Sequence, residues 1–252
     1  MVVINKKRIQ LITGCILISL FTFLFQIGRK EKAVEIKETV ATPISNKTIV
    51  LDAGHGIPDE GAQSSKGTTE AETNLKITLK LQNLLEQSGC QVILTRSDEN
   101  AIYSLDAKTL REKKISDIRN RVKIGNESSA DIFVSIHLNK IPQPQYSGWQ
   151  CFYNSSNEKS MKLSKIIQSC LNESIQKENN RVAMKLDTVY IMKHVEIPIS
   201  IVECGFLSNP EEEQQLLDDS YQDRLAWGIY NGIMRYFSEM DSWVKKVAKF
   251  LK

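Results

Sequence analysis

The chain has 252 residues and a net charge of +3, and its 41% hydrophobic and 25% charged residues are ordinary for a globular protein. This weak charge, without a nucleic-acid-binding motif, argues against a nucleic-acid partner. The five cysteines are odd in number and lack CxxC spacing, which argues against a disulfide framework and a cysteine zinc site. The length therefore predicts one α/β domain of about 205 residues behind an N-terminal segment.

Residues 1–30 are predicted to be a membrane anchor or an export signal. An apolar run over residues 9–27 is flanked by basic residues on both sides. No small-x-small cleavage site ends this run, so an uncleaved anchor is favoured over a cleaved signal peptide. Cys15 is not interpreted as a lipoprotein cysteine, because most of the apolar run follows it instead of preceding it. The segment is expected to attach the protein to the cytoplasmic membrane.

Residues 31–47 are polar and lack periodicity, which predicts a linker, and the folded domain is expected over residues 48–252. In this domain, short apolar runs typical of buried strands alternate with segments of helical periodicity. Strands are expected at 48–52, 91–95, 131–137, 150–153, 189–192 and 199–203, and helices at 69–88, 115–125, 163–171 and 225–237. This order predicts an α/β fold with a mostly parallel or mixed twisted sheet, covered by helices on both faces.

Local patterns refine this prediction at a few positions. Thr69 and Glu72 have the spacing of a capping box, which predicts a helix start at Thr69. Residues 100–114 are charged and aperiodic, so a surface loop is expected there. His194 is expected in a polar turn at the surface or rim. The basic tail, residues 243–252, is predicted to pack on the domain as a helix rather than contact a membrane.

Two of the three histidines follow predicted strands directly. His55 stands between Gly54 and Gly56, and His137 ends a fully apolar strand. Side chains at the carboxyl ends of strands in an α/β sheet lie where ligands usually bind. Either histidine alone is more typical of an ordinary loop or core residue, but the pair at two strand ends favours a metal site.

Three glutamates are candidates for the rest of such a site. Glu70 and Glu72 compete for one ligand position, and Glu70 is favoured because Glu72 already serves the capping box. Glu203 ends a buried strand, where a carboxylate is costly unless it is paired or functional. A nucleophilic Cys204 is disfavoured, because its apolar setting gives no reason for a lowered pKa. Two histidines, one glutamate ligand and one spare glutamate are the set that a single-zinc hydrolase needs.

These motifs resemble the zinc-dependent N-acetylmuramoyl-L-alanine amidases of bacterial cell walls, the amidase-3 family, over about residues 48–237. The run from Val202 to Glu211 especially resembles the germination-specific members from spore-forming bacteria. The resemblance implies three zinc ligands and one catalytic carboxylate, namely His55, Glu70, His137 and Glu203. Arg121 and Asn126 also match family positions and are interpreted as structural. Ile57 and Ala71 depart from the usual pattern, which leaves the substrate rim open but touches no ligand.

The resemblance also implies the reaction and its place. The bond is the amide between the lactyl group of N-acetylmuramic acid and L-alanine in peptidoglycan, so the domain is expected outside the cytoplasmic membrane. In spore cortex, removal of the stem peptide would allow formation of the muramic-δ-lactam that germination needs. The need for an activating protein partner stays open.

Two other functions share part of this pattern. An anchored glycan-binding protein could use the same groove without turnover, but all four polar residues of the catalytic set are present. A zinc carboxypeptidase shares the His, Glu, His ligand plan, but it needs an arginine to bind a terminal carboxylate, and the sequence assigns none. Zinc content and release of peptide from cell wall separate these alternatives.

Overall fold

The computed structural model describes residues 16–20, 22 and 42–250. Residues 16–20 are helical, and from residue 42 onward the chain folds as one α/β domain. Its strands are β1 (Thr48–Ala53), β2 (Gln91–Leu94), β3 (Ile132–Asn139), β4 (Gln150–Tyr153), β5 (Met184–Lys185) and β6 (Ile199–Phe206). Its helices are α2 (Glu70–Gln87), α3 (Leu110–Glu127), α4 (Glu158–Ile175), α5 (Tyr190–His194), α6 (Pro210–Leu217) and α7 (Asp219–Phe250).

The strands form one mixed sheet, as the sequence predicts, and the structure gives their order as β2-β1-β3-β6-β4-β5. β2, β1, β3 and β6 are mutually parallel, whereas β4 runs antiparallel to β6. The carboxyl ends of β1, β3 and β6 therefore meet at one edge, and the start of β4 joins them there. Polar side chains that end these strands therefore lie close together at this edge, where ligands usually bind in α/β sheets.

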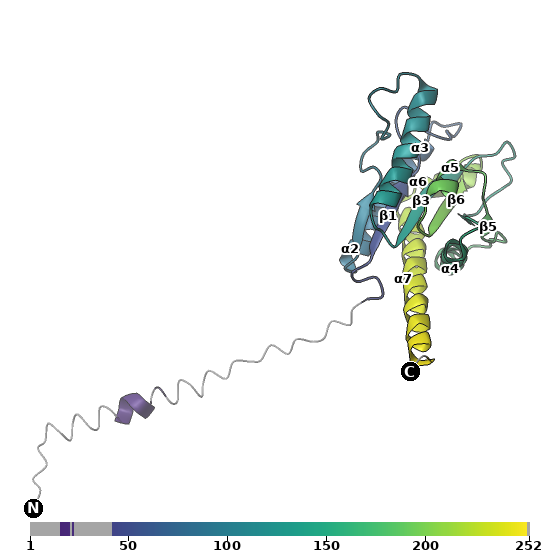
Figure 1. Ribbon diagram of the computed structural model, residues 1–252. Coiled ribbons are helices and arrows are strands. Elements are labelled where there is room, and N and C mark those ends of the chain that lie inside the picture. Colours follow the sequence, from purple (N-terminus) through teal and green to yellow (C-terminus); the bar gives the residue numbers. More distant parts are fainter. Residues whose placement is uncertain (1–15, 21, 23–41, 251–252) are drawn as a thin grey trace, which may run out of the picture. The chain divides into compact units, whose positions relative to one another are not determined.

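Helices cover both faces of the sheet (Figure 1). On one face, apolar side chains of α2, α4 and α7 pack on alternate residues of the central strands, such as Val134 and Val202. On the other face, α3 and α5 pack on the intervening residues, such as Phe133 and Ile201. The strands are thus buried on both sides, which explains why their sequences are continuous apolar runs. Residues 42–47, which precede the predicted domain start, form a turn with Ile44 fully buried.

Three local predictions were wrong. Residues 110–114 are the first turn of α3 rather than loop, because Thr109 and Glu112 form the capping box there. Thr69 does cap α2, accepting a hydrogen bond from the Glu72 amide, but Glu72 binds Lys76 at 2.6 Å instead of completing a box. The predicted strand at 189–192 is α5, since a short apolar run does not distinguish helix from strand.

The cysteines of the described part of the chain are structural. Cys90, Cys151, Cys170 and Cys204 are all free thiols and are at most 6% exposed. Burial raises the pKa of the Cys90 thiol to about 12 and that of Cys204 well above its ordinary value. They act as small hydrophobic residues, as the sequence indicates.

None of the helices formed by the described residues is long and apolar enough to cross a bilayer. The predicted anchor over residues 1–30 lies largely outside residues 16–20, 22 and 42–250, so it stays a prediction.

Candidate metal centre

His55 follows β1 in an unusual backbone conformation. Its φ of 63° is in the left-handed region, which a residue with a Cβ adopts at a cost. Arg121, from α3, stabilises this turn by donating hydrogen bonds to the carbonyl oxygens of Ala53 and His55 at 2.7 and 2.5 Å. Arg96 donates to the Ala53 and Gly54 carbonyls at 2.8 and 3.0 Å. Two buried guanidinium groups therefore hold the end of β1.

The Arg121 side chain is itself fixed by two acids. It is 2% exposed and forms ion pairs with Asp52 at 2.6 Å and Asp117 at 2.7 Å. Burial opposes ionisation of Asp52, but the Arg121 charge and the hydrogen bonds from Ser135 and Thr95 outweigh it and lower the pKa of this carboxyl. Arg121, which the sequence analysis interprets as structural, thus supports the backbone of the candidate ligand His55.

Glu70 is the first residue of α2 and lies between the two histidines. Its Oε1 is 2.9 Å from His137 Nδ1, and its Oε2 is 3.3 Å from His55 Nε2. The same two oxygens accept hydrogen bonds from the Leu138 and Ala62 amides at 3.1 and 2.8 Å. Glu72, the rival candidate, points to solvent and binds Lys76, so Glu70 is the carboxylate that the fold brings to the histidines.

His55, Glu70 and His137 could together hold a metal ion. Their donor atoms all lie within 4.8 Å of one another. Tetrahedral zinc, with bonds of about 2.0–2.2 Å, needs donors about 3.3–3.6 Å apart, a spacing that small side-chain movements reach. Two imidazoles and one carboxylate are also a donor set of catalytic zinc sites, which leave a fourth position open.

Asp59, a residue that the sequence analysis did not predict to be part of the site, contacts the candidate ligand His55. Its carboxylate lies 3.2 Å from His55 Nδ1 and 2.8 Å from Lys114 Nζ. This bond leaves His55 Nε2 facing Glu70, which is the orientation that a metal ligand requires. Burial disfavours the His55 imidazolium, but Asp59 and Glu70 outweigh it and raise the His55 pKa to about 9. A metal would therefore compete with a proton here.

Glu203 faces the same site from β6. It is the register partner of His137 on the neighbouring strand, so both side chains project from one face of the sheet. Its Oε2 is buried and has no hydrogen-bond partner among the described residues. Burial, the largest cause, outweighs the opposing charges of His137 and His55 and, together with the Glu70 charge, raises the pKa of Glu203 to about 7. An orphaned carboxyl oxygen beside three donors is suited to contact a bound water or substrate.

The other residues discussed in the sequence analysis do not belong to the candidate metal centre. His194 ends α5, is exposed and stacks on Tyr190, and the metal-binding cluster of the described residues does not include it. Asn126 joins α3 to the end of α5 through the His194 carbonyl and the Glu196 amide, in line with a structural role. Cys204 is fully buried.

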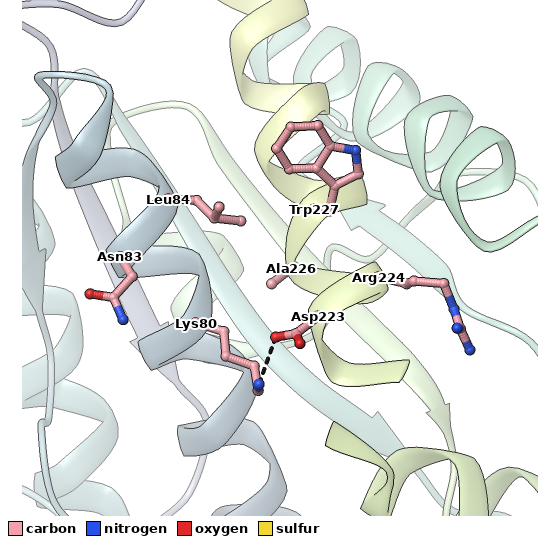
Figure 2. A pocket seen from close by; sticks show the side chains of 7 residues that line it. All are labelled: Lys80, Asn83, Leu84, Asp223, Arg224, Ala226 and Trp227. Carbon is pink, nitrogen blue, oxygen red and sulfur yellow. Dashed lines mark hydrogen bonds and ion pairs between the residues drawn. The ribbon is translucent and has the colours of Figure 1, made fainter. Parts of the chain in front are cut away.

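A separate hollow of about 530 Å³ lies between α2 and α7 (Figure 2). Lys80, one of its lining residues, forms ion pairs with Asp223 at 2.6 Å and Asp219 at 2.8 Å. No residue of the candidate metal centre lines this hollow. The hollow is therefore distinct from the candidate site at the carboxyl ends of the strands.

The N-acetylmuramoyl-L-alanine amidase family called Amidase_3 matches residues 49–235 of this chain. The chain belongs to this amidase family. It is therefore a hydrolase of the amide bond between N-acetylmuramic acid and L-alanine, as the resemblance implies.

Individual relatives agree with this assignment. The germination-specific N-acetylmuramoyl-L-alanine amidase of Bacillus subtilis is 36% identical over 233 residues, which cover 92% of this chain and 95% of the relative. The CwlD amidase of Clostridioides difficile, solved in complex with the GerS lipoprotein, is 47% identical with a TM-score of 0.75, covering 77% of this chain and 99% of that one. An N-acetylmuramoyl-L-alanine amidase of Clostridium difficile 630 is 30% identical with a TM-score of 0.67, covering 76% and 97%.

Proposed function

We propose that this amidase is zinc-dependent, that His55, Glu70 and His137 hold the ion, and that Glu203 is the catalytic carboxylate. The observation that carries the proposal is the buried Oε2 of Glu203, on the strand next to His137, which has no hydrogen-bond partner among residues 42–250. A carboxyl with a pKa of about 7 can accept and return a proton near neutral pH. The positive charge of a bound ion would lower this pKa and favour the carboxylate, the form that acts as a base.

Each residue then has a role in amide hydrolysis. When bound, zinc supplies a Lewis acid that polarises the scissile carbonyl and promotes ionisation of water near neutral pH. Glu203 takes the proton of the attacking water and passes it to the nitrogen of the leaving L-alanine. Asp59 keeps the His55 ring oriented, and Arg121 holds the backbone that carries it.

Substituting Glu203 by Gln tests this division of roles. The variant keeps the shape of the side chain but cannot accept a proton, so we expect a normal zinc content and a loss of turnover of at least about 100-fold. Glu196→Gln, the same change at an exposed position, is the control. Zinc is measured by elemental analysis, and cleavage by mass spectrometry of treated cell wall with and without chelator. An active Glu203→Gln enzyme would remove Glu203 from the mechanism.

The biological substrate that we propose is spore-cortex peptidoglycan outside the cytoplasmic membrane. Similarity to the germination-specific amidase over nearly the whole of both chains supports this choice. Removal of the stem peptide would expose the muramic acid carboxyl for lactam formation by a second enzyme. A deletion strain should therefore form spores that lack muramic-δ-lactam and do not complete germination. Normal lactam in such spores would refute the cortex assignment and leave a vegetative-wall amidase.

A protein partner is part of the proposal. The CwlD relative was solved in complex with a lipoprotein, and similarity to it supports an analogous extracytoplasmic partner for this chain. Co-purification of the full chain from sporulating cells would identify such a partner, whereas full activity of the isolated chain would show that no activator is needed.

A further inference from the structure

The row of side chains that contains His137 and Glu203 continues onto β4. Gln150 is the antiparallel register partner of Glu203, as His137 is its parallel partner. Directly opposed residues project from the same face of a sheet, so Gln150 extends the row beyond Glu203. Neighbouring strands are about 4.8 Å apart, which places Gln150 about 10 Å from His137 along this edge.

Arg181 is attached to the end of this row. Its Nη1 donates to Gln150 Oε1 at 3.0 Å, and its Nε donates to the Ser147 carbonyl at 2.9 Å. The guanidinium also lies over the Phe206 ring, 4.5 Å from the centroid. These contacts hold the guanidinium in one place, and the residue as a whole is partly exposed to solvent.

Arg181 has no direct ion-pair partner in the described part of the chain, although its charge acts on the buried Glu212 carboxyl nearby. No carboxylate of residues 42–250 forms an ion pair with it, in contrast to Arg121 and Arg235. The nearby Glu212 directs its two oxygens to the Gly148 and Phe206 amides instead, at 2.7 and 2.8 Å. Two of the five guanidinium N–H groups of Arg181 are used, and Nη2 has no partner among these residues.

We propose that Arg181 binds a carboxylate of the peptide that leaves in the reaction. This inference rests on the proposed function, because the scissile amide must lie between the metal ligands and Glu203. The leaving peptide ends in at least one carboxylate. An extended peptide spans about 3.3 Å per residue, so about three residues cover the roughly 10 Å from His137 to Gln150, the residue to which Arg181 is bonded. A fixed planar guanidinium is the group that binds a carboxylate through two parallel hydrogen bonds.

Paired substrates test the proposal. The full chain, loaded with zinc, is given N-acetylmuramoyl tripeptide and the same compound with every peptide carboxylate amidated. For Arg181→Gln we expect a KM that is about 10–100-fold higher on the carboxylate substrate, with kcat within about threefold. On the amidated substrate, both constants should match wild type within about threefold. Arg181→Lys should be intermediate. Arg224→Gln, at an exposed arginine of α7 that contacts neither Gln150 nor a candidate metal ligand, should resemble wild type.

The outcomes separate this inference from the proposed function. Equal losses on both substrates would show that Arg181 only supports the loop and β4, and unchanged constants on both would exclude it from binding. If Arg181→Gln fails to fold, judged by its thermal transition, the wild-type enzyme decides, because it should prefer the carboxylate substrate by at least about tenfold. If wild type cleaves neither substrate, the proposed function fails, and calorimetric binding of the free tripeptide, compared with its amide, still tests Arg181.

Discussion

Replacing Arg121 by Met is expected to lower the free energy of unfolding by about 3–5 kcal/mol, because it leaves buried carboxylates without their cation. Asp52 is 1% exposed, and Arg121 binds it at 2.6 Å together with Asp117 at 2.7 Å. The variant also loses the hydrogen bonds to the Ala53 and His55 carbonyls. For a domain of this size, such a loss corresponds to a melting temperature lower by roughly 6–20 °C.

Arg235→Met is the matched control. Arg235 forms a two-bond pair with Glu173 at 2.8 and 2.9 Å, but both side chains are about half exposed. An exposed pair contributes at most about 1 kcal/mol, so the melting temperature should change by less than about 4 °C. Calorimetry of the zinc-free full chain compares the two variants. Similar losses in both would refute the argument that burial sets the cost.

Three further tests address the centre and its support. Gly61→Ala should weaken zinc binding, because the new Cβ would lie 2.6 Å from Glu70 Oε2. Gly67→Ala is the control: this glycine also has a positive φ but lies in open space, so the change should lower stability without affecting zinc affinity, which zinc titration measures. Glu70→Ala should abolish zinc binding, but Glu72→Ala should cost under about 1 kcal/mol; the reverse would overturn the ligand choice. Since the folded state lowers the pKa of Asp52, its carboxylate stabilises the fold fully above about pH 4 and less as pH falls further. The stability gap between wild type and Asp52→Asn in urea should therefore shrink from neutral to acid pH, and a constant gap would contradict the linkage.

The sequence predicts the central strands and the candidate ligands for a common physical reason. Strands buried on both faces must be continuous apolar runs, so β1, β3 and β6 are visible in the sequence. Polar residues that end such runs meet at one edge of a parallel sheet. His55, His137 and Glu203 are therefore found together without knowledge of the strand order.

Other features depend on contacts between distant segments. Arg121 meets the end of β1 across a sequence separation of 66 residues, and no local pattern reports this. Arg181 lies in a polar loop, and its link to Gln150 follows only from the pairing of β4 with β6. Asp59 lies only four residues after His55, so the sequence does bring the two close together. However, the conformation of a loop cannot be predicted from this spacing, and the contact between the two side chains was therefore missed.

The buried thiols have a consequence for where this protein can work. A thiolate is the form that reacts with oxidants and disulfides, and burial keeps Cys90, Cys151, Cys170 and Cys204 protonated and out of reach. The described domain also contains no crosslink that a reducing environment could open. No disulfide of this domain has to form for the described residues to fold, so at the proposed extracytoplasmic location the domain needs no disulfide-forming enzyme.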